Sequence, residues 1–251
     1  MSKTWEALKK ADAERSHPAR PLNLTMPIVR SAAVSPAAPD DAHLEYERIR
    51  VWLRHSADPS QRLQTLMVVA CHSGAGGTTT ASLLAVTLAE ARSCRVLVIE
   101  SNWRTPKLGS VFGLPRHHSE NGHPFDLAAL EARISASDRP NLFVLPAPDR
   151  NDSPQRPFED DTLDELLAAA KLRFDLVIFD AAPVGLFPDS LALAAKVDGV
   201  ILVTESERTR MDEARRAKDD LERAGARILG VVINRHTDYV PRFLRRALGS
   251  H

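Results

Sequence analysis

The chain has 251 residues, enough for one α/β domain and an irregular tail. Its 33 Lys and Arg residues balance 33 Asp and Glu residues, so it lacks the global positive charge that non-specific binding to nucleic acid requires. No apolar run approaches the roughly 18 residues that span a bilayer, and no signal-peptide segment opens the chain. Composition therefore disfavours a nucleic-acid partner and predicts that any membrane attachment goes through another protein.

Residues 1–41 are predicted to form a disordered or extended tail, and residues 42–251 a single domain. The tail contains five prolines, which disfavour helix, at Pro18, Pro21, Pro27, Pro36 and Pro39. Structure is expected to resume with a helix over LEYERIRVWL, residues 44–53. Its spacing predicts Leu44, Ile49 and either Trp52 or Leu53 on one packed face.

From residue 66 onward, short apolar runs alternate with helical periods. Continuous apolar runs are typical of strands that are covered on both faces, and parallel strands need helical crossovers between them. The predicted strands are 66–70, 96–99, 142–145, 176–179, 200–203 and 228–233, and the predicted helices are 78–92, 161–172, 190–196 and 209–223. The pattern predicts an α/β fold, a doubly wound and mainly parallel sheet in a three-layer sandwich.

The first predicted strand runs directly into a glycine-rich turn and then into a helix. A strand, a glycine turn and a helix N-terminus together aim backbone N–H groups at a phosphate. The predicted cradle consists of Ser73, Gly74, Ala75, Gly76, Gly77, Thr78 and Thr79. The match to the P-loop pattern is partial, because Gly77 stands where the lysine is usual and Cys71 where the first glycine is usual. The alternative is a flexible βα turn that binds nothing.

Three further segments follow the glycine turn in a fixed order. They read VLVIESNWRTPKLGSVFGL, FDLVIFDAAPVGLFPDSLALAAKVDGVILV and RILGVVINR. Together with the turn they resemble the cytoplasmic bacterial tyrosine kinases, or BY-kinases, of capsule and exopolysaccharide operons, over roughly residues 44–235. The resemblance implies a P-loop NTPase-like kinase domain, with ATP or ADP and Mg²⁺ as the expected ligands.

The resemblance also assigns roles to individual positions. Thr78 and Asp180 match the hydroxyl and the Walker B carboxylate that hold Mg²⁺ in that family. Glu100, Asn102 and Arg104 match the catalytic Asp-x-Asp-x-Arg stretch, in which both aspartates have been replaced here. Asn102 cannot take a proton, and Gly77 cannot neutralise a phosphate, so the site is predicted to be degenerate and nucleotide binding to be weak or lost.

The resulting interpretation is a pseudokinase of exopolysaccharide biosynthesis or export, for a capsule- or holdfast-type polymer. The resemblance implies a cytoplasmic protein, peripheral to the inner membrane through a membrane polysaccharide co-polymerase, a Wzz-like chain-length regulator, and able to form homo-oligomers. Two alternatives remain open: an active ATP-dependent protein-tyrosine autokinase with an atypical site, and a relative of the partition and cellulose-secretion ATPases.

Overall fold

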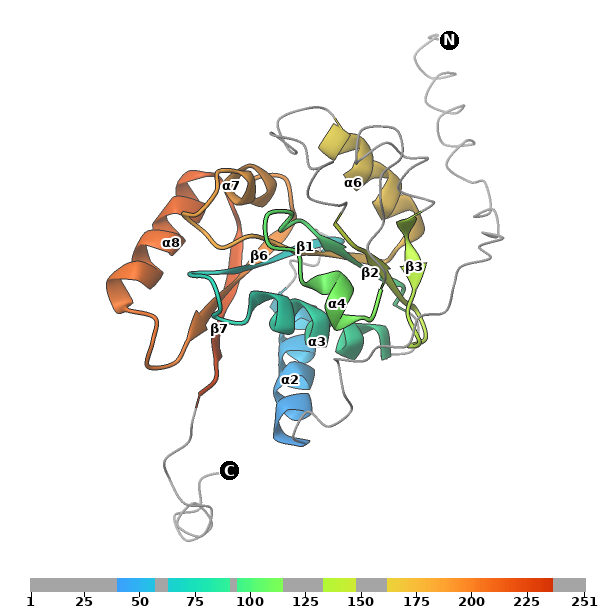
Figure 1. Cartoon of the computed structure of the whole chain (residues 1–251), viewed down its shortest axis with the longest axis horizontal. Coiled ribbons are helices and arrows are strands. Elements are labelled where there is room, and N and C mark those ends of the chain that lie inside the picture. Colours follow the sequence, from blue (N-terminus) through green and yellow to red (C-terminus); the bar gives the residue numbers. More distant parts are fainter. Residues whose placement is uncertain (1–39, 57–62, 91–93, 115–132, 148–161, 237–251) are drawn as a thin grey trace, which may run out of the picture.

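The structure is a computed structural model that describes residues 40–56, 63–90, 94–114, 133–147 and 162–236 (Figure 1). The predicted tail up to residue 39 lies outside these ranges, so the proposed division into tail and domain stays a prediction. The predicted helix after the tail is confirmed as α2 (Asp40–Ser56).

A seven-stranded sheet forms the centre of the molecule, in the order β3-β4-β2-β5-β1-β6-β7. The strands are β1 (Thr65–Ala70), β2 (Val96–Glu100), β3 (Ser135–Ala136), β4 (Leu142–Leu145), β5 (Leu176–Asp180), β6 (Gly199–Glu205) and β7 (Ile228–Asn234). All neighbouring pairs are parallel except β3 and β4. The predicted doubly wound, mainly parallel sheet is confirmed, and only the two-residue strand β3 was not anticipated.

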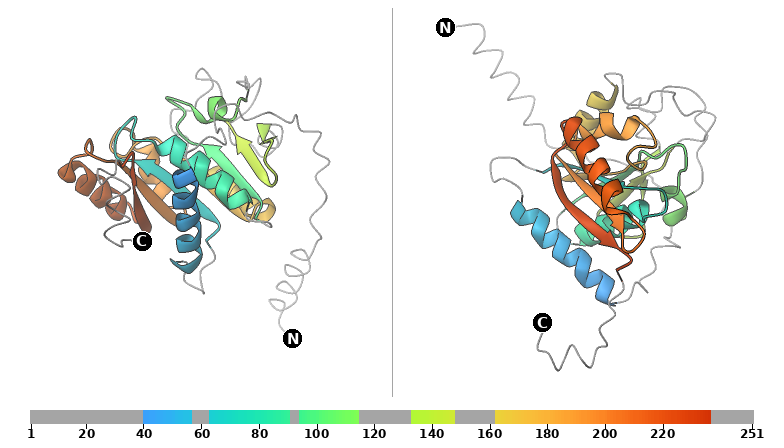
Figure 2. Two further views of the ribbon diagram at one scale, coloured as in Figure 1. Left: turned by 90° about the horizontal axis from the view of Figure 1, so that it is seen from below. Right: turned by 90° about the vertical axis from the view of Figure 1, so that its left-hand side faces the viewer.

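Helices cover both faces of this sheet, which gives three layers (Figures 1 and 2). One face carries α2, α3 (Gly77–Glu90) and α4 (Leu108–Val111), and the other carries α6 (Thr162–Arg173), α7 (Asp189–Ala194) and α8 (Met211–Arg223). Each layer buries its own apolar cluster against the sheet. Every residue of β1, β2, β5 and β6 is buried, which explains why these strands read as unbroken apolar runs.

Helix α2 packs with most of the predicted face, but not with Leu44. Tyr46, Ile49 and Leu53 contact the cluster around α3, whereas the side chain of Leu44 is 55% exposed. Trp52 reaches the edge strand instead, because its indole lies over Gly230 of β7, where any side chain would collide with the ring. The periodicity identified the helix correctly but misplaced Leu44, because the neighbouring elements decide which side of a helix is covered.

The carboxyl ends of the parallel strands meet along one edge of the sheet. There β1 continues into the glycine turn, β2 ends at Glu100, β5 at Asp180 and β7 at Asn234. In open α/β sheets, ligands bind in the crevice outside this edge. Within the described residues, no helix is both long and apolar enough to cross a bilayer.

Candidate phosphate-binding site

The glycine turn connects β1 to α3 and has the backbone shape of a phosphate loop. Gly74 and Gly76 have φ angles of 87° and 98°, a region that residues with a Cβ rarely adopt. The backbone of Gly77, by contrast, is open to a side chain, because a Cβ there would lie 3.4 Å from the Cβ of Ala70. Glycine is therefore required by the backbone at position 76 but not at position 77.

The turn presents unused hydrogen-bond donors. Helix α3 begins at Gly77, and the first turn of any helix leaves its N–H groups without intrahelical acceptors. The backbone N–H groups of residues 76–79 donate to no carbonyl or side chain among the described residues. These donors and the positive end of α3 together favour an anion at this point.

The turn is anchored to the neighbouring strands β6 and β7. The Cys71 N–H donates to the carbonyl of Val203 at 2.9 Å, and the side-chain amide of Asn234 donates to the carbonyl of Ala75 at 2.8 Å. A Cβ added to Gly76 would lie 1.9 Å from that amide nitrogen. The end of β7 thus supports the turn directly, and Gly76 is needed for both its φ angle and this close approach.

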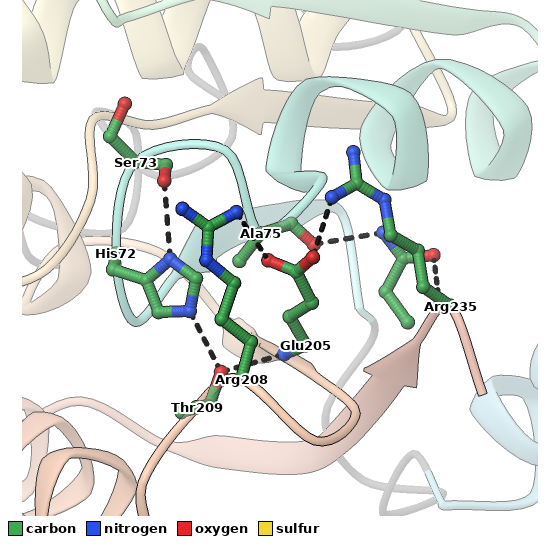
Figure 3. Close-up of polar contacts among 8 residues, drawn as sticks. His72, Ser73, Ala75, Glu205, Arg208, Thr209 and Arg235 are labelled. Atoms are coloured by element: carbon green, nitrogen blue, oxygen red, sulfur yellow. Dashed lines mark hydrogen bonds and ion pairs between the residues drawn. The ribbon is translucent and has the colours of Figure 1, made fainter.

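His72 links the turn to the segment between β6 and α8 (Figure 3). Its Nδ1 lies 3.1 Å from the carbonyl oxygen of Ser73, which can only accept, so Nδ1 carries the proton. Nε2 lies 2.9 Å from the hydroxyl of Thr209, and that hydroxyl also accepts the N–H of Glu205 at 2.7 Å. In the neutral imidazole, Thr209 therefore donates to Nε2, and the ring is fixed in one tautomer.

Beside His72, the carboxylate of Glu205 is bound by two arginines (Figure 3). Arg235 reaches one oxygen at 2.6 Å and Arg208 the other at 3.5 Å. The hydrogen bond from Arg235 is the main reason why the pKa of Glu205 lies below its usual range. Glu207 and Arg235 both have positive φ angles, 61° and 55°, without being glycine. Strained backbone of this kind concentrates at ligand sites.

Asp180 ends β5 beneath the turn and is 1% exposed. Neither carboxylate oxygen has a hydrogen-bond partner. Burial raises the pKa of Asp180 to about 8; the nearby Thr78 hydroxyl lowers it in part, and the charge of Glu100 raises it further. Buried polar atoms are nearly always hydrogen-bonded, so an unpartnered carboxylate beside a phosphate-type loop marks a place for a cationic ligand.

Thr78 and Asp180 together suit Mg²⁺. This ion is usually held by one or two protein oxygens together with phosphate and water oxygens, rather than by a full protein cage. In keeping with that, the described ranges hold no group of three or more His, Cys, Asp or Glu side chains arranged around a metal position. The oxygen atoms of these two side chains fit a magnesium ion that binds together with a nucleotide. Thr78 and Asp180 remain predicted ligands.

Glu100 has its carboxylate engaged by the protein itself. One oxygen accepts the backbone N–H groups of Lys107 and of Leu108, the latter at 2.6 Å, and the other accepts the N–H of Ala147 at 3.2 Å. Burial raises the pKa of Glu100, and these backbone hydrogen bonds act in the opposite direction. The side chain fixes the start of α4 and the segment after β4. Its predicted catalytic role would have to compete with this structural one.

Asn102 and Arg104 lie on the segment that follows β2. The Asn102 side-chain oxygen accepts the hydroxyl of Thr105 at 3.1 Å. The Arg104 guanidinium lies over the ring of Phe187 at 4.3 Å and 3.6 Å from the carboxylate of Asp189, which opens α7. The structure therefore gathers the predicted site residues at one edge of the sheet, but the β2 segment uses its polar groups for internal contacts.

Sequence reasoning missed the support from β7. RILGVVINR was recognised as the last core strand, but no role was given to Asn234 or Arg235, which contact the turn and Glu205. The signal was available, because an Asn-Arg pair at the carboxyl end of a parallel strand lies at the ligand edge of the sheet. What was missing was the strand order, which places β7 two strands from β1.

Comparisons with known proteins agree with the sequence resemblance. No family model matches the chain. The tyrosine-protein kinase CpsD of Streptococcus agalactiae is 28% identical over 182 residues, which is 70% of this chain and 76% of the relative. The crystal structure of the VpsO kinase domain superimposes with a TM-score of 0.64 at 28% identity, covering 80% of this chain and all of that domain. The homologues are thus named bacterial tyrosine-protein kinases.

A second group of structures shares the fold. The septum site-determining protein MinD of Pyrococcus horikoshii, in complex with Mg-ADP, gives a TM-score of 0.56 at 22% identity and covers 74% of this chain and 76% of its own. At that identity the likeness concerns the fold alone. The P-loop NTPase-like architecture is confirmed by both groups.

Proposed function

We propose, on the premise that this chain is a homologue of the bacterial tyrosine-protein kinases, that it is a nucleotide-binding pseudokinase of exopolysaccharide biosynthesis or export. The proposal is supported by a contrast between the parts of the site that are retained and the lysine position, which is not. The backbone cradle and the pair Thr78 and Asp180 are in place, whereas Gly77 leaves the lysine position without a charge.

The magnitudes favour retained binding over retained catalysis. Losing one charge-assisted hydrogen bond to phosphate costs about 1.5–3 kcal/mol, which the free N–H groups of the turn can partly offset. Losing a fixed positive charge where negative charge develops in the transition state costs about 100- to 1000-fold in rate. Asn102 adds a second loss, because an amide cannot serve as a general base. Mg²⁺, when bound with nucleotide, would neutralise phosphate charge beside Asp180.

Calorimetric titration of the whole chain with Mg-ADP and Mg-ATP tests the binding half of the proposal. We expect weak, Mg²⁺-dependent binding that is reduced at least 10-fold in Thr78→Ala. The matched control is Thr87→Ala, which removes a hydroxyl from the same helix nine residues after Thr78, where it donates to the carbonyl of Leu83. Absence of binding in the unmodified chain, or equal binding in Thr78→Ala, would contradict the proposal.

The partner follows from the resemblance. We infer that the chain acts at the cytoplasmic face of the inner membrane on a Wzz-like polysaccharide co-polymerase, as a homo-oligomer or a single subunit. If the role is regulatory, polymer output in a strain that lacks the gene is restored by the Asp180→Asn variant as well as by the unmodified chain. Loss of output with Asp180→Asn, at normal protein level and fold, would count against a purely regulatory role.

An active protein-tyrosine autokinase is the second candidate, favoured by the retained Thr78 and Asp180 and by the names of the homologues. Incubation with Mg-ATP and a cytoplasmic fragment of the co-polymerase, followed by detection of phosphotyrosine, separates the two. Phosphotyrosine that disappears in Asp180→Asn would establish the kinase. Nucleotide-dependent dimerisation without phosphotyrosine would instead favour the partition-type ATPase, whose fold the chain shares.

A further inference from the structure

The site described above lacks a positive charge of its own at the position where a nucleotide phosphate would sit. Gly77 supplies none, and Asp180, the buried acid at the end of β5, has no hydrogen-bond partner. An anion placed between the turn and this acid needs a cation nearby, because like charges at short range in a low dielectric repel strongly. Mg²⁺ can meet part of this need, and a side chain must meet the rest.

Most cationic side chains around the crevice are already engaged. Arg208 and Arg235 both bind Glu205, and Arg104 is stacked on Phe187 next to Asp189. His72 is bonded through both ring nitrogens, to Ser73 and to Thr209. Moving any of them toward a phosphate would break contacts that the folded chain already makes.

Lys107 differs from these residues. Its side chain is exposed and forms no hydrogen bond or ion pair with any other residue in the described ranges. Its backbone is fixed at the same edge of the sheet, because its N–H is bound by Glu100, and Glu100 is the register neighbour of Asp180 across β2 and β5. The charge of the Lys107 ammonium also acts on the Asp180 carboxylate, so the two groups lie on the same side of the crevice.

We propose that Lys107 supplies the cation that faces the nucleotide phosphates, in place of the lysine that is missing at Gly77. The backbone is held rigidly by Glu100, while the four-carbon stem remains free to reach toward the turn. A lysine is suited to this task, since it acts on phosphate as a point charge and needs no fixed planar geometry. This inference rests on the proposed nucleotide site, and it names the residue that completes it.

The test is a titration of the whole chain with Mg-ADP and, separately, with AMP. We expect Lys107→Met to weaken Mg-ADP binding about 10- to 100-fold, the loss expected for one charge-assisted contact, and to leave AMP binding nearly unchanged. Lys107→Arg should retain most of the affinity. The matched control is Lys218→Met, which removes the same charge from α8, where Lys218 pairs with Glu222.

A rescue variant separates a lost phosphate contact from a structural defect. Gly77 has room for a side chain, so Gly77→Lys in the Lys107→Met background should restore Mg-ADP affinity to at least the original value. Equal Mg-ADP binding by Lys107→Met and the unmodified chain would overturn the assignment of Lys107 but leave the nucleotide site standing. No binding by the unmodified chain would overturn the proposed function itself, and with it this inference.

Discussion

Two buried carboxylates at the ends of neighbouring strands differ in the hydrogen-bond donors that surround them. Glu100 on β2 and Asp180 on β5 are aligned in register, and both are at most 3% exposed. Glu100 accepts three backbone N–H groups, whereas Asp180 accepts none. The carboxylate on the β2 side is satisfied by backbone donors and stabilises the fold, whereas the carboxylate on the β5 side has no donor.

The largest loss of stability is expected at Glu100. Glu100→Ala leaves three backbone N–H groups without an acceptor, two of them buried, so the free energy of unfolding should fall by about 3–5 kcal/mol. Urea denaturation, monitored by circular dichroism, measures this free energy of unfolding. Ser110→Ala, an exposed change in α4, serves as the control. A loss below about 1 kcal/mol would mean that the carboxylate is free for another role.

Asp180→Asn should act in the opposite direction, and only at high pH. The carboxyl group ionises near pH 4 in the unfolded chain but at about pH 8 in the folded one, so the stability of the unmodified protein falls as the pH rises between these values. Asparagine cannot ionise. The free energy of unfolding of the variant should therefore exceed that of the unmodified chain by on the order of 5 kcal/mol at pH 8 and by little at pH 4. Thermal unfolding across this pH range measures the difference. A gain that does not change with pH would show that the carboxyl is not destabilised by burial.

Gly76→Ala tests the rigid part of the turn. The φ angle of 98° and the amide of Asn234 both oppose a Cβ, so we expect a loss of about 1–3 kcal/mol together with faster amide exchange in residues 73–79. Asn234→Ala should give the same pattern of exchange with a smaller loss, about 1 kcal/mol, because it removes only the hydrogen bond to Ala75. If the exchange is unchanged in both variants, β7 does not support the turn.

Gly77→Ala is expected to have the smallest effect and the opposite sign from Gly76→Ala. Position 77 lies at the start of α3 in a backbone that alanine adopts easily, so the variant should be more stable by about 0.5 kcal/mol. Chemical denaturation of both glycine variants side by side measures the contrast. A destabilised Gly77→Ala would mean that this glycine is needed for the backbone, and that the missing lysine could not simply be put back.

The family resemblance and most of the architecture could be read from the sequence. Six apolar runs became six parallel strands, and four of them, β1, β2, β5 and β6, are buried throughout, as a strand covered on both faces must be. The edge strand β7 is apolar but partly exposed. The resemblance also assigned Thr78 and Asp180 to one Mg²⁺ site, and the two residues lie at the edge where the carboxyl ends of the parallel strands meet. Leu44 of α2 was predicted to be packed but is exposed. Periodicity predicts a helix, but it does not say which neighbouring element will cover each side of that helix.

By itself, then, the sequence determined the order of elements, the backbone of the turn and the replacement of its lysine by Gly77. Only the tertiary structure decided what each polar group does. Glu100 and Asp180 look alike along the chain, but donors from α4 and from the end of β4 reach the first and not the second. Hydrogen bonds between distant segments depend on strand order and loop path, and a linear pattern does not encode either directly.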